Sequence, residues 1–219
     1  MPDNGRIIWL SWQTPVEGMS MALPDPTDVA SYDKELAKVT IGGPQPLTAP
    51  IEIRDYDPEW PHLYQREEAR IRSILRDRVI RIAHAGSTSV PALPAKPVID
   101  IVLEVPDSAE ESTYVPDMES EGYVLRVREP EWFEHRVLKG PDTNVNLHVF
   151  SSGCAEVDRM LLFRDWLRSN VADRELYATA KRELAARDWK YTQQYADAKT
   201  AIVRDIMSRA QAAMSTREL

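Results

Sequence analysis

Residues 84–105 read "HAGSTSVPALPAKPVIDIVLEV", and this stretch decides the fold. It joins two apolar segments that are typical of strands, one over residues 79–85 and one over residues 97–105. Between them lie a Gly-Ser-Thr-Ser turn, two prolines and Lys96, and a third proline at the same spacing opens the second segment. A turn of small polar residues followed by a lysine suits an anionic group, so the stretch predicts a site for a phosphorylated ligand.

Asp100 lies inside the second of these strands, among β-branched neighbours. Because side chains alternate along a strand, Asp100 is expected to share a face with Val98, Val102 and Glu104. An ionised carboxylate in such surroundings is costly unless it is paired, hydrogen-bonded or bound to a cation. Two interpretations follow: Asp100 caps a loop or pairs with a cation such as Lys96, or it belongs to a ligand site.

The turn itself supports a ligand site. Gly86 permits backbone conformations that other residues avoid, and Ser87 and Thr88 add hydroxyl groups. Turns of this kind can direct successive N–H groups at an anion, and Lys96 is a candidate partner for a phosphate. The three prolines recur every three residues, which is the period of a polyproline helix and would stiffen the connection.

The chain resembles the GrpB family in several segments that together cover about residues 51–210, and "GSTSVP…KPVID" is the most diagnostic of them. The resemblance implies a nucleotidyltransferase-like fold, whose hallmark is a Gly-Ser turn followed by Asp-x-Asp or Asp-x-Glu on a strand. Twelve residues separate Ser87 from Asp100, which fits that spacing. Val102, however, occupies the position of the second carboxylate. This motif alone cannot hold two Mg²⁺ ions, so another strand supplies ligands or the protein has a different activity.

The rest of the chain divides near residue 50. Residues 1–50 are rich in proline and glycine and are expected to form a mobile leader with one helical turn near residues 31–39. If translation starts at Met19 or Met21, the residues before that methionine are an over-called start rather than functional sequence. Residues 51–215 are expected to form one domain of class α+β, with a mixed β-sheet, flanking helices and a helical tail from about residue 158.

In that domain, residues 51–56 are expected to form a strand and residues 57–77 a one-faced helix that Asp57 caps. Residues 109–124 are expected to be helical. The tail is expected to contain three helices, the last of which runs from Lys190 to about Met214.

His148 is the main candidate to complete the site, because it shares a strand face with Asn146. Its imidazole would act with Asp100 as a catalytic general base or metal ligand, and Asp100 would hold Mg²⁺. The alternative is a histidine hydrogen-bonded to a neighbour on the sheet. Further candidates are His84, His135, Arg136 and Glu104.

The helical tail adds cationic candidates. Arg164 and Arg168 are four residues apart on one helix side and are expected to bind a phosphate or, alternatively, to pair with nearby carboxylates. Two Tyr-Lys pairs repeat this spacing, Tyr177 with Lys181 and Tyr195 with Lys199, and these are expected to pack a ring in the core and leave the amine in solvent.

The composition limits the function. The chain has 219 residues, a net charge of −8 and one cysteine, so no internal disulfide and no general attraction to nucleic acid or anionic lipid are expected. No segment approaches the roughly 18 apolar residues of a membrane span, and a cytoplasmic protein is expected.

Two hypotheses therefore remain for the function. One is a nucleotidyltransferase-like enzyme or ligase that binds a nucleotide or phosphorylated small molecule. The other is a catalytically silent module for binding or folding assistance, with a protein partner. The missing carboxylate favours the silent module, whereas the convergence of polar groups favours the enzyme.

Overall fold

The computed structural model describes residues 29–215, with side chains from residue 32 onward. Its centre is one five-stranded mixed sheet in the order β1-β2-β5-β4-β3. The strands are β1 Arg81–Ala85, β2 Ile99–Val105, β3 Val124–Glu129, β4 His135–Lys139 and β5 Val145–Ser151. β2 and β5 are parallel, and the other neighbouring strands are antiparallel. The predicted α+β class with a mixed sheet and a helical C-terminal segment is confirmed.

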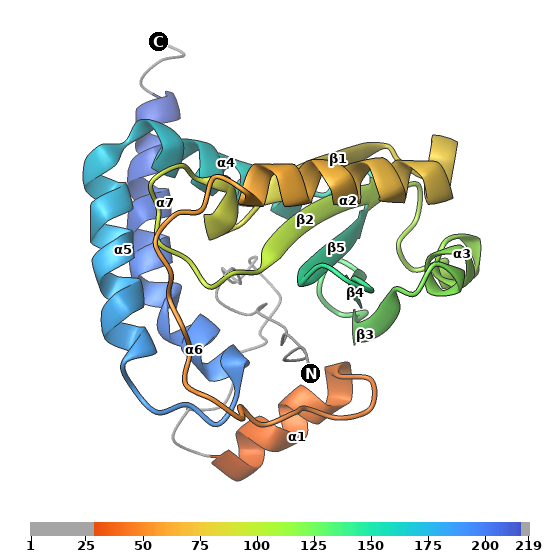
Figure 1. The fold of residues 1–219 in the computed structure, drawn as a ribbon, viewed down its shortest axis with the longest axis horizontal. Helices are drawn as coiled ribbons and strands as arrows, with labels where there is room; N and C mark the ends of the chain where they lie inside the picture. Colours follow the sequence, from red (N-terminus) through yellow and green to blue (C-terminus); the bar gives the residue numbers. More distant parts are fainter. Residues whose placement is uncertain (1–28, 216–219) are drawn as a thin grey trace.

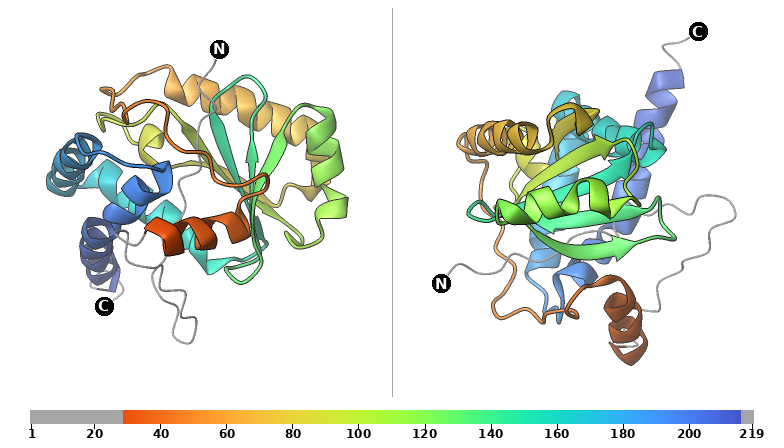
Figure 2. Two further views of the ribbon diagram at one scale, coloured as in Figure 1. Left: turned by 90° about the horizontal axis from the view of Figure 1, so that it is seen from below. Right: turned by 90° about the vertical axis from the view of Figure 1, so that its right-hand side faces the viewer.

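Helices cover both faces of this sheet (Figure 1). They are α1 Val29–Val39, α2 Trp60–Leu75, α3 Val115–Ser120, α4 Ala155–Ser169, α5 Val171–Ala185, α6 Thr192–Ala198 and α7 Thr200–Ser215. α2 and α3 share one hydrophobic core with the sheet, and α4, α5 and α7 share a second core with its other face. Figure 2 shows the C-terminal helices gathered at one end of the sheet and α3 at the other.

The segment before the first strand differs in detail from the expectation. The expected strand over residues 51–56 is reduced to one bridge between Arg54 and Ala95. α2 begins at Trp60 rather than at residue 57, and Asp57 accepts a hydrogen bond from the backbone N–H of Glu59 at 2.9 Å. Residues 109–124 likewise contain only the short α3 and a 3₁₀ turn.

Residues 29–50 were expected in the mobile leader, but they pack on the domain. The helical turn expected near residues 31–39 is the 11-residue helix α1. The buried Tyr32 donates a hydrogen bond from its hydroxyl to Asp197, and the N–H of Leu47 donates to the carbonyl of Lys190 at 2.7 Å. The rest of the expected leader, including Met19 and Met21, lies outside the described residues.

Asp173, at the start of α5, connects the helices of the C-terminal tail through hydrogen bonds. Its carboxylate accepts from Trp166 Nε1 at 2.6 Å and from Arg209 Nη2 at 2.7 Å, which joins α4, α5 and α7. The helix expected from Lys190 to Met214 is broken into α6 and α7, with Lys199 between them. This break directs Lys199 toward the sheet.

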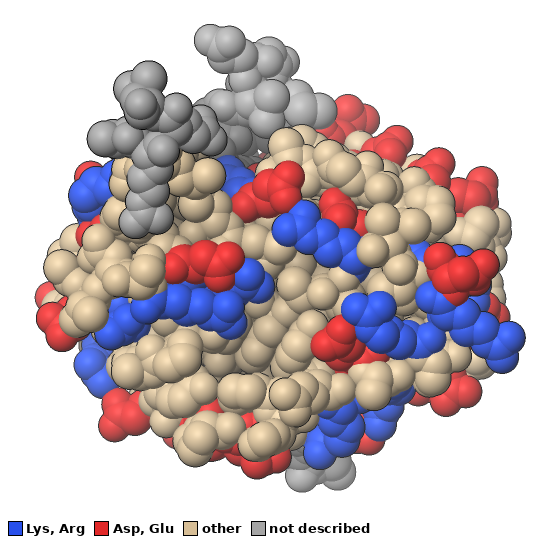
Figure 3. All heavy atoms as spheres, turned by 90° about the horizontal axis from the view of Figure 1, so that it is seen from above, with Lys and Arg blue, Asp and Glu red and all other residues tan. Residues whose placement is uncertain are grey.

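Charges on the face drawn in Figure 3 alternate in sign, and lysine and arginine do not gather there into one basic patch. Charges of opposite sign also pair within single helices, as Arg72 does with Glu68 at 2.9 Å on α2. Across the helices that the structure describes, none combines the length and apolarity that crossing a bilayer requires.

Candidate functional site

A cavity of about 40 Å³ lies on the sheet face that the C-terminal helices cover. Six residues that the sequence singled out line it together, namely Gly86, Ser87, Thr88, Lys96, Asp100 and His148. Four more polar residues come from the helical tail: Tyr177, Lys181, Tyr195 and Lys199. The turn and the strand aspartate therefore open onto one hollow.

The turn depends on Gly86. Its φ is 65°, and a Cβ atom added there would lie 2.3 Å from Oδ2 of Asp100. The following 3₁₀ turn, Ser87–Ser89, is closed by the Ser89 hydroxyl, which donates to the carbonyl of Gly86 at 2.6 Å. The N–H groups of Ser89 and Val90 also donate inside the turn, so these two amides do not face a ligand.

The proline segment does not form the polyproline helix that the spacing of its prolines predicted. Ala92 has a φ of 62°, and the N–H of Leu93 donates to the carbonyl of Val90 at 3.2 Å. Pro91 thus stands at the second position of a tight turn and Ala92 at the third, as in a type II turn. The turn buries Leu93 and brings the carbonyl of Pro94 to the cavity wall.

Asp100 is held by a polar row that crosses three strands. Asn146 on β5 donates from Nδ2 to Oδ1 of Asp100 at 2.7 Å, and Lys139 on β4 donates to Oδ1 of Asn146 at 2.5 Å. Burial by itself would raise the pKa of Asp100, but the adjacent imidazole of His148, the hydrogen bond from Asn146 and the charge of Lys139 hold that pKa below its ordinary value. Asp100 is therefore ionised at neutral pH.

His148 lies beside Asp100, with 3.7 Å between Nε2 and Oδ1. Burial lowers the pKa of His148 to about 3, although the carboxylate of Asp100 opposes this shift. The imidazole is therefore neutral at physiological pH, and it does not add positive charge to the cavity.

Two lysines of the cavity are nearly inaccessible to solvent, which contradicts the expectation of solvated amines. Lys181 is 2% exposed and Lys199 is 6% exposed. Each amine lies 4.8 Å from the ring centre of the tyrosine four residues before it, Tyr177 and Tyr195 respectively. Among the described residues neither amine forms an ion pair; Lys181 donates instead to the carbonyl of Pro94.

Burial also changes the charge state of these amines. It lowers the pKa of Lys199 to about 8, against the attraction of Asp100 and Asp197. It lowers the pKa of Lys181 well below the ordinary value, and the charge of Lys199 adds to this effect. A buried ammonium group without a carboxylate partner is an expensive arrangement, which an incoming anion would relieve.

The sequence contains a signal that would have located Lys181. The buried positions of α5 include Tyr177, Ala178, Lys181 and Leu184, spaced as one helix face. Lys181 thus stands in the middle of an apolar stripe, where a solvated amine is not possible. No comparable pattern marks Lys199, because its burial depends on the break between α6 and α7.

Arg164 and Arg168 are not among the residues that line the cavity. Arg164 donates to the carbonyl of His84 at 2.9 Å, and Arg168 donates through Nε and Nη2 to the carbonyl of Ser89 at 3.0 and 2.8 Å. Both also pair with Asp165. Arg164 therefore holds the end of β1, and Arg168 holds the end of the turn that follows it.

His84 stabilises the turn through a hydrogen bond to Thr88. Its Nε2 lies 3.0 Å from Oγ1 of Thr88, and the Thr88 hydroxyl donates to the carbonyl of Val98 at 3.0 Å. Since that hydroxyl has one hydrogen, Nε2 of His84 is the donor in the first contact. The ring stacks on Tyr64 at 4.8 Å, and burial lowers the pKa of His84 to about 4, so this histidine is neutral.

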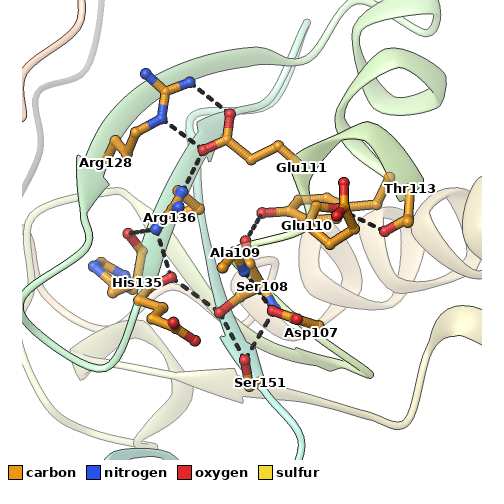
Figure 4. A network of polar contacts seen from close by, with 12 residues as sticks. Asp107, Ser108, Ala109, Glu110, Glu111, Thr113, Arg128, His135, Arg136 and Ser151 are labelled. Carbon is orange, nitrogen blue, oxygen red and sulfur yellow. Dashed lines mark hydrogen bonds and ion pairs between the residues drawn. The ribbon is translucent and has the colours of Figure 1, made fainter.

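His135 and Arg136 serve the packing of the sheet rather than the cavity. His135 is buried, with Nδ1 at 2.7 Å from Oε2 of Glu129. Figure 4 shows Arg136 beside Arg128, both bound to Glu111, which fastens the loop after β2 to the sheet.

Glu104 is the remaining candidate from the strand that carries Asp100. It is also buried outside the cavity, and it accepts the N–H of Gly153 at 3.1 Å.

The donor set does not fit a protein-built Mg²⁺ site. Among the described residues that line the cavity, Asp100 is the one carboxylate, and three are lysines. Val102 packs in the apolar core, at the place of the second carboxylate. Over residues 29–215, no three or more His, Cys, Asp or Glu side chains are grouped as a metal site would need.

Comparison with known proteins agrees with this architecture. A solved structure of the conserved protein GrpB from Enterococcus faecalis superposes with a TM-score of 0.65 and 29% identity, over 74% of this chain and 99% of that one. This neighbour is consistent with the nucleotidyltransferase-like fold.

Similar sequences are named UPF0157 proteins. UPF0157 protein BH1888 of Halalkalibacterium halodurans is 59% identical over 82% of this chain and 92% of its own length. A UPF0157 protein of Streptomyces coelicolor is 44% identical over 79% and 90%. A dephospho-CoA kinase of Mycolicibacterium paratuberculosis is 29% identical, with 46% of its length covered. The family model described as GrpB protein matches residues 50–209, and the chain therefore belongs to the GrpB family.

Proposed function

We propose that this protein binds a phosphorylated small molecule, with a phosphate group in the cavity among Lys96, Lys181 and Lys199. The observation that carries the proposal is the burial of two amines, Lys181 and Lys199, without a carboxylate partner among the described residues. A purely structural lysine is normally left at the surface or paired.

The energetics favour an anionic ligand. Burying an unpaired ammonium group costs several kcal/mol, and the lowered pKa values of Lys181 and Lys199 reflect that cost. A charge pair at 4 Å contributes about 4 kcal/mol at an effective dielectric constant of 20, so a phosphate near two amines offsets much of it. A neutral ligand would leave the amines as they are.

A catalytic role is the second candidate, and the pairing of Asp100 with His148 favours it. An ionised carboxylate beside a neutral imidazole can bind and orient a ligand hydroxyl through hydrogen bonds, but the lowered pKa values of both groups make each a weak proton acceptor. Nucleotidyl transfer or ligation with Mg²⁺ is the form that the fold suggests, but the missing second carboxylate at Val102 speaks against a metal held by the protein alone. Three similar proteins are named dephospho-CoA kinases, and less than half of each is matched, so the name carries no activity to this chain.

Without catalysis, the same cavity would serve a silent binding module. A phosphorylated ligand would then act as a signal or a stored molecule, and a protein partner would read the bound state. The apolar packing of Val102 favours this version.

Thermal denaturation with phosphorylated compounds tests the proposal. Nucleotides and sugar phosphates are added at millimolar concentration with and without Mg²⁺, and a ligand at 100 times its Kd stabilises the folded state by about 2.7 kcal/mol. The expected result is a clear rise in Tm with at least one compound, lost in the double variant Lys181→Met, Lys199→Met. If no phosphorylated compound shifts Tm, the proposal is wrong.

A matched control separates the site from general charge effects. Lys190 also lies over a tyrosine, 5.0 Å from the ring centre of Tyr191, but it does not line the cavity. Lys190→Met should keep the ligand-induced shift. Asp100→Asn tests the catalytic candidate: if Mg²⁺ takes part, its effect on Tm disappears in this variant, and if the effect persists the metal is not bound by Asp100.

A further inference from the structure

The size, the charge and the fixed amines of the cavity limit which phosphorylated molecules it can bind, and this inference rests on the proposed function. We infer that the cavity accepts a single terminal phosphate, that of a phosphate monoester, and excludes polyphosphate chains. The remainder of the ligand then stays outside the ring of lysines.

Size is the first argument. The cavity measures about 40 Å³, which is room for about three water molecules. A tetrahedral group with its oxygens fits a space of this order, whereas sites that enclose a whole cofactor measure hundreds of Å³. A second phosphate of a longer chain would not fit inside this space beside the first.

Charge is the second argument. Three lysines and one aspartate line the cavity, which leaves a net charge of +2 when all four are ionised. A phosphate monoester carries about −2 at neutral pH and matches this charge, but a triphosphate brings more negative charge than the lysines balance. Asp100 would then face phosphate oxygens without a compensating cation, which disfavours a longer chain.

The rigidity of the amines is the third argument. They come from three separate segments, the loop before β2, α5 and the junction of α6 with α7. Lys181 is fixed by the carbonyl of Pro94, and both Lys181 and Lys199 rest on tyrosine rings. These contacts hold Lys181 and Lys199 in place, so these two amines do not move outward to follow a second phosphate. The apolar Val98 and Met160 complete the lining, and their side chains have no hydrogen-bond donor.

Isothermal titration at constant ionic strength tests the inference with four probes: inorganic phosphate, phenyl phosphate, diphosphate and ATP. The expected result is that phenyl phosphate and inorganic phosphate bind within about tenfold of each other, and that diphosphate and ATP bind at least about tenfold more weakly. Lys181→Met and Lys199→Met should each weaken phenyl phosphate by about tenfold or more, while Lys190→Met leaves it unchanged.

The outcomes separate the two claims. If diphosphate or ATP binds as tightly as phenyl phosphate, the single-phosphate inference is overturned and the proposed function stands. If none of the four probes binds, both are overturned. The Met variants remain folded on physical grounds, because an unbranched apolar side chain in place of a buried unpaired amine is neutral or stabilising, and circular dichroism without ligand checks this.

Discussion

Gly86 and Asp100 approach so closely that a single methyl group on the glycine would lie 2.3 Å from a carboxylate oxygen of the aspartate. The turn and the strand therefore form one unit, in which the glycine is required both for its positive φ and for its lack of a side chain. This contact sets the distance between the turn and Asp100, the one carboxylate that lines the cavity in the described part of the chain.

The substitution Gly86→Ala should damage both folding and binding. With φ 65° and ψ −173°, Gly86 lies in a region that is essentially restricted to glycine and costs another residue about 1–3 kcal/mol, and the clash with Asp100 adds about 1–3 kcal/mol. Denaturant unfolding should show a total loss of roughly 2–6 kcal/mol, together with loss of the ligand-induced rise in Tm.

Gly153→Ala is the matched control for this substitution. Gly153 has a φ of 76° but no atom within 4 Å of an added Cβ. It should lose only the conformational cost of about 1–2 kcal/mol. Equal losses in the two variants would show that the close approach to Asp100 does not matter.

Asn146→Ala should release Asp100. The substitution leaves Asp100 and Lys139 without the amide that joins them, and an unmade hydrogen bond to a buried charged group costs about 1–3 kcal/mol or more. The pKa of Asp100 should rise, because burial then acts with less compensation. A carboxyl carbon NMR titration measures the pKa, and Asn144→Ala, at an exposed asparagine two residues earlier, should leave it unchanged.

Much of this site could be predicted from local patterns. Strand alternation places Asp100, Asn146 and His148 on one face, and the register of β2 with β5 sets Asp100 directly beside Asn146 as that alternation requires. A glycine before three small polar residues correctly marked the turn. These features follow from the period of a strand and from backbone conformation, which a sequence records directly.

The lysines and the arginines could not be assigned in the same way. Spacing tells which helix side Arg164 and Arg168 share, but their partners proved to be carbonyls of a turn about 80 residues away in sequence. Lys199 is buried because the last helix breaks beside it, where the sequence has neither glycine nor proline. Partners distant in sequence are chosen by packing, and packing is not a periodic signal.

Arg168 should act on the turn rather than on the ligand. Arg168→Gln removes the double hydrogen bond to the carbonyl of Ser89, and we expect a loss of about 1 kcal/mol in stability and only a few-fold loss in phosphate affinity. If Arg168 bound phosphate directly, affinity would fall by about tenfold or more and would depend less on salt.

Arg174→Gln is the control for Arg168. Arg174 also donates to main-chain carbonyls, those of Leu167 and Arg168, but not to the turn. Its substitution should leave the phosphate affinity of the protein unchanged and affect stability alone.

Lys199 should give folding and ligand binding opposite dependences on pH. Its pKa is about 8 in the folded protein and 10.5 ordinarily, because burial disfavours the charged amine while Asp100 and Asp197 favour it and Lys96 opposes it. Below pH 8 both states hold the proton and the cost of burial is constant. Between about pH 8 and 10.5 the unfolded chain keeps a proton that the folded protein releases, so the free energy of unfolding rises with pH, by up to about 3 kcal/mol.

Phosphate affinity should change in the other direction over the same interval. A monoester gains its second charge near pH 6, so binding strengthens there and then weakens as Lys199 loses its proton above about pH 8. Chemical denaturation and titration calorimetry at pH 6, 7, 8 and 9 measure both quantities. Lys199→Met should abolish both the part of the rise in stability that comes from Lys199 and the decline in phosphate affinity, because both depend on the same proton. If the variant keeps one of these pH dependences, another group governs it, and Lys181 is the first candidate because it is also a buried lysine.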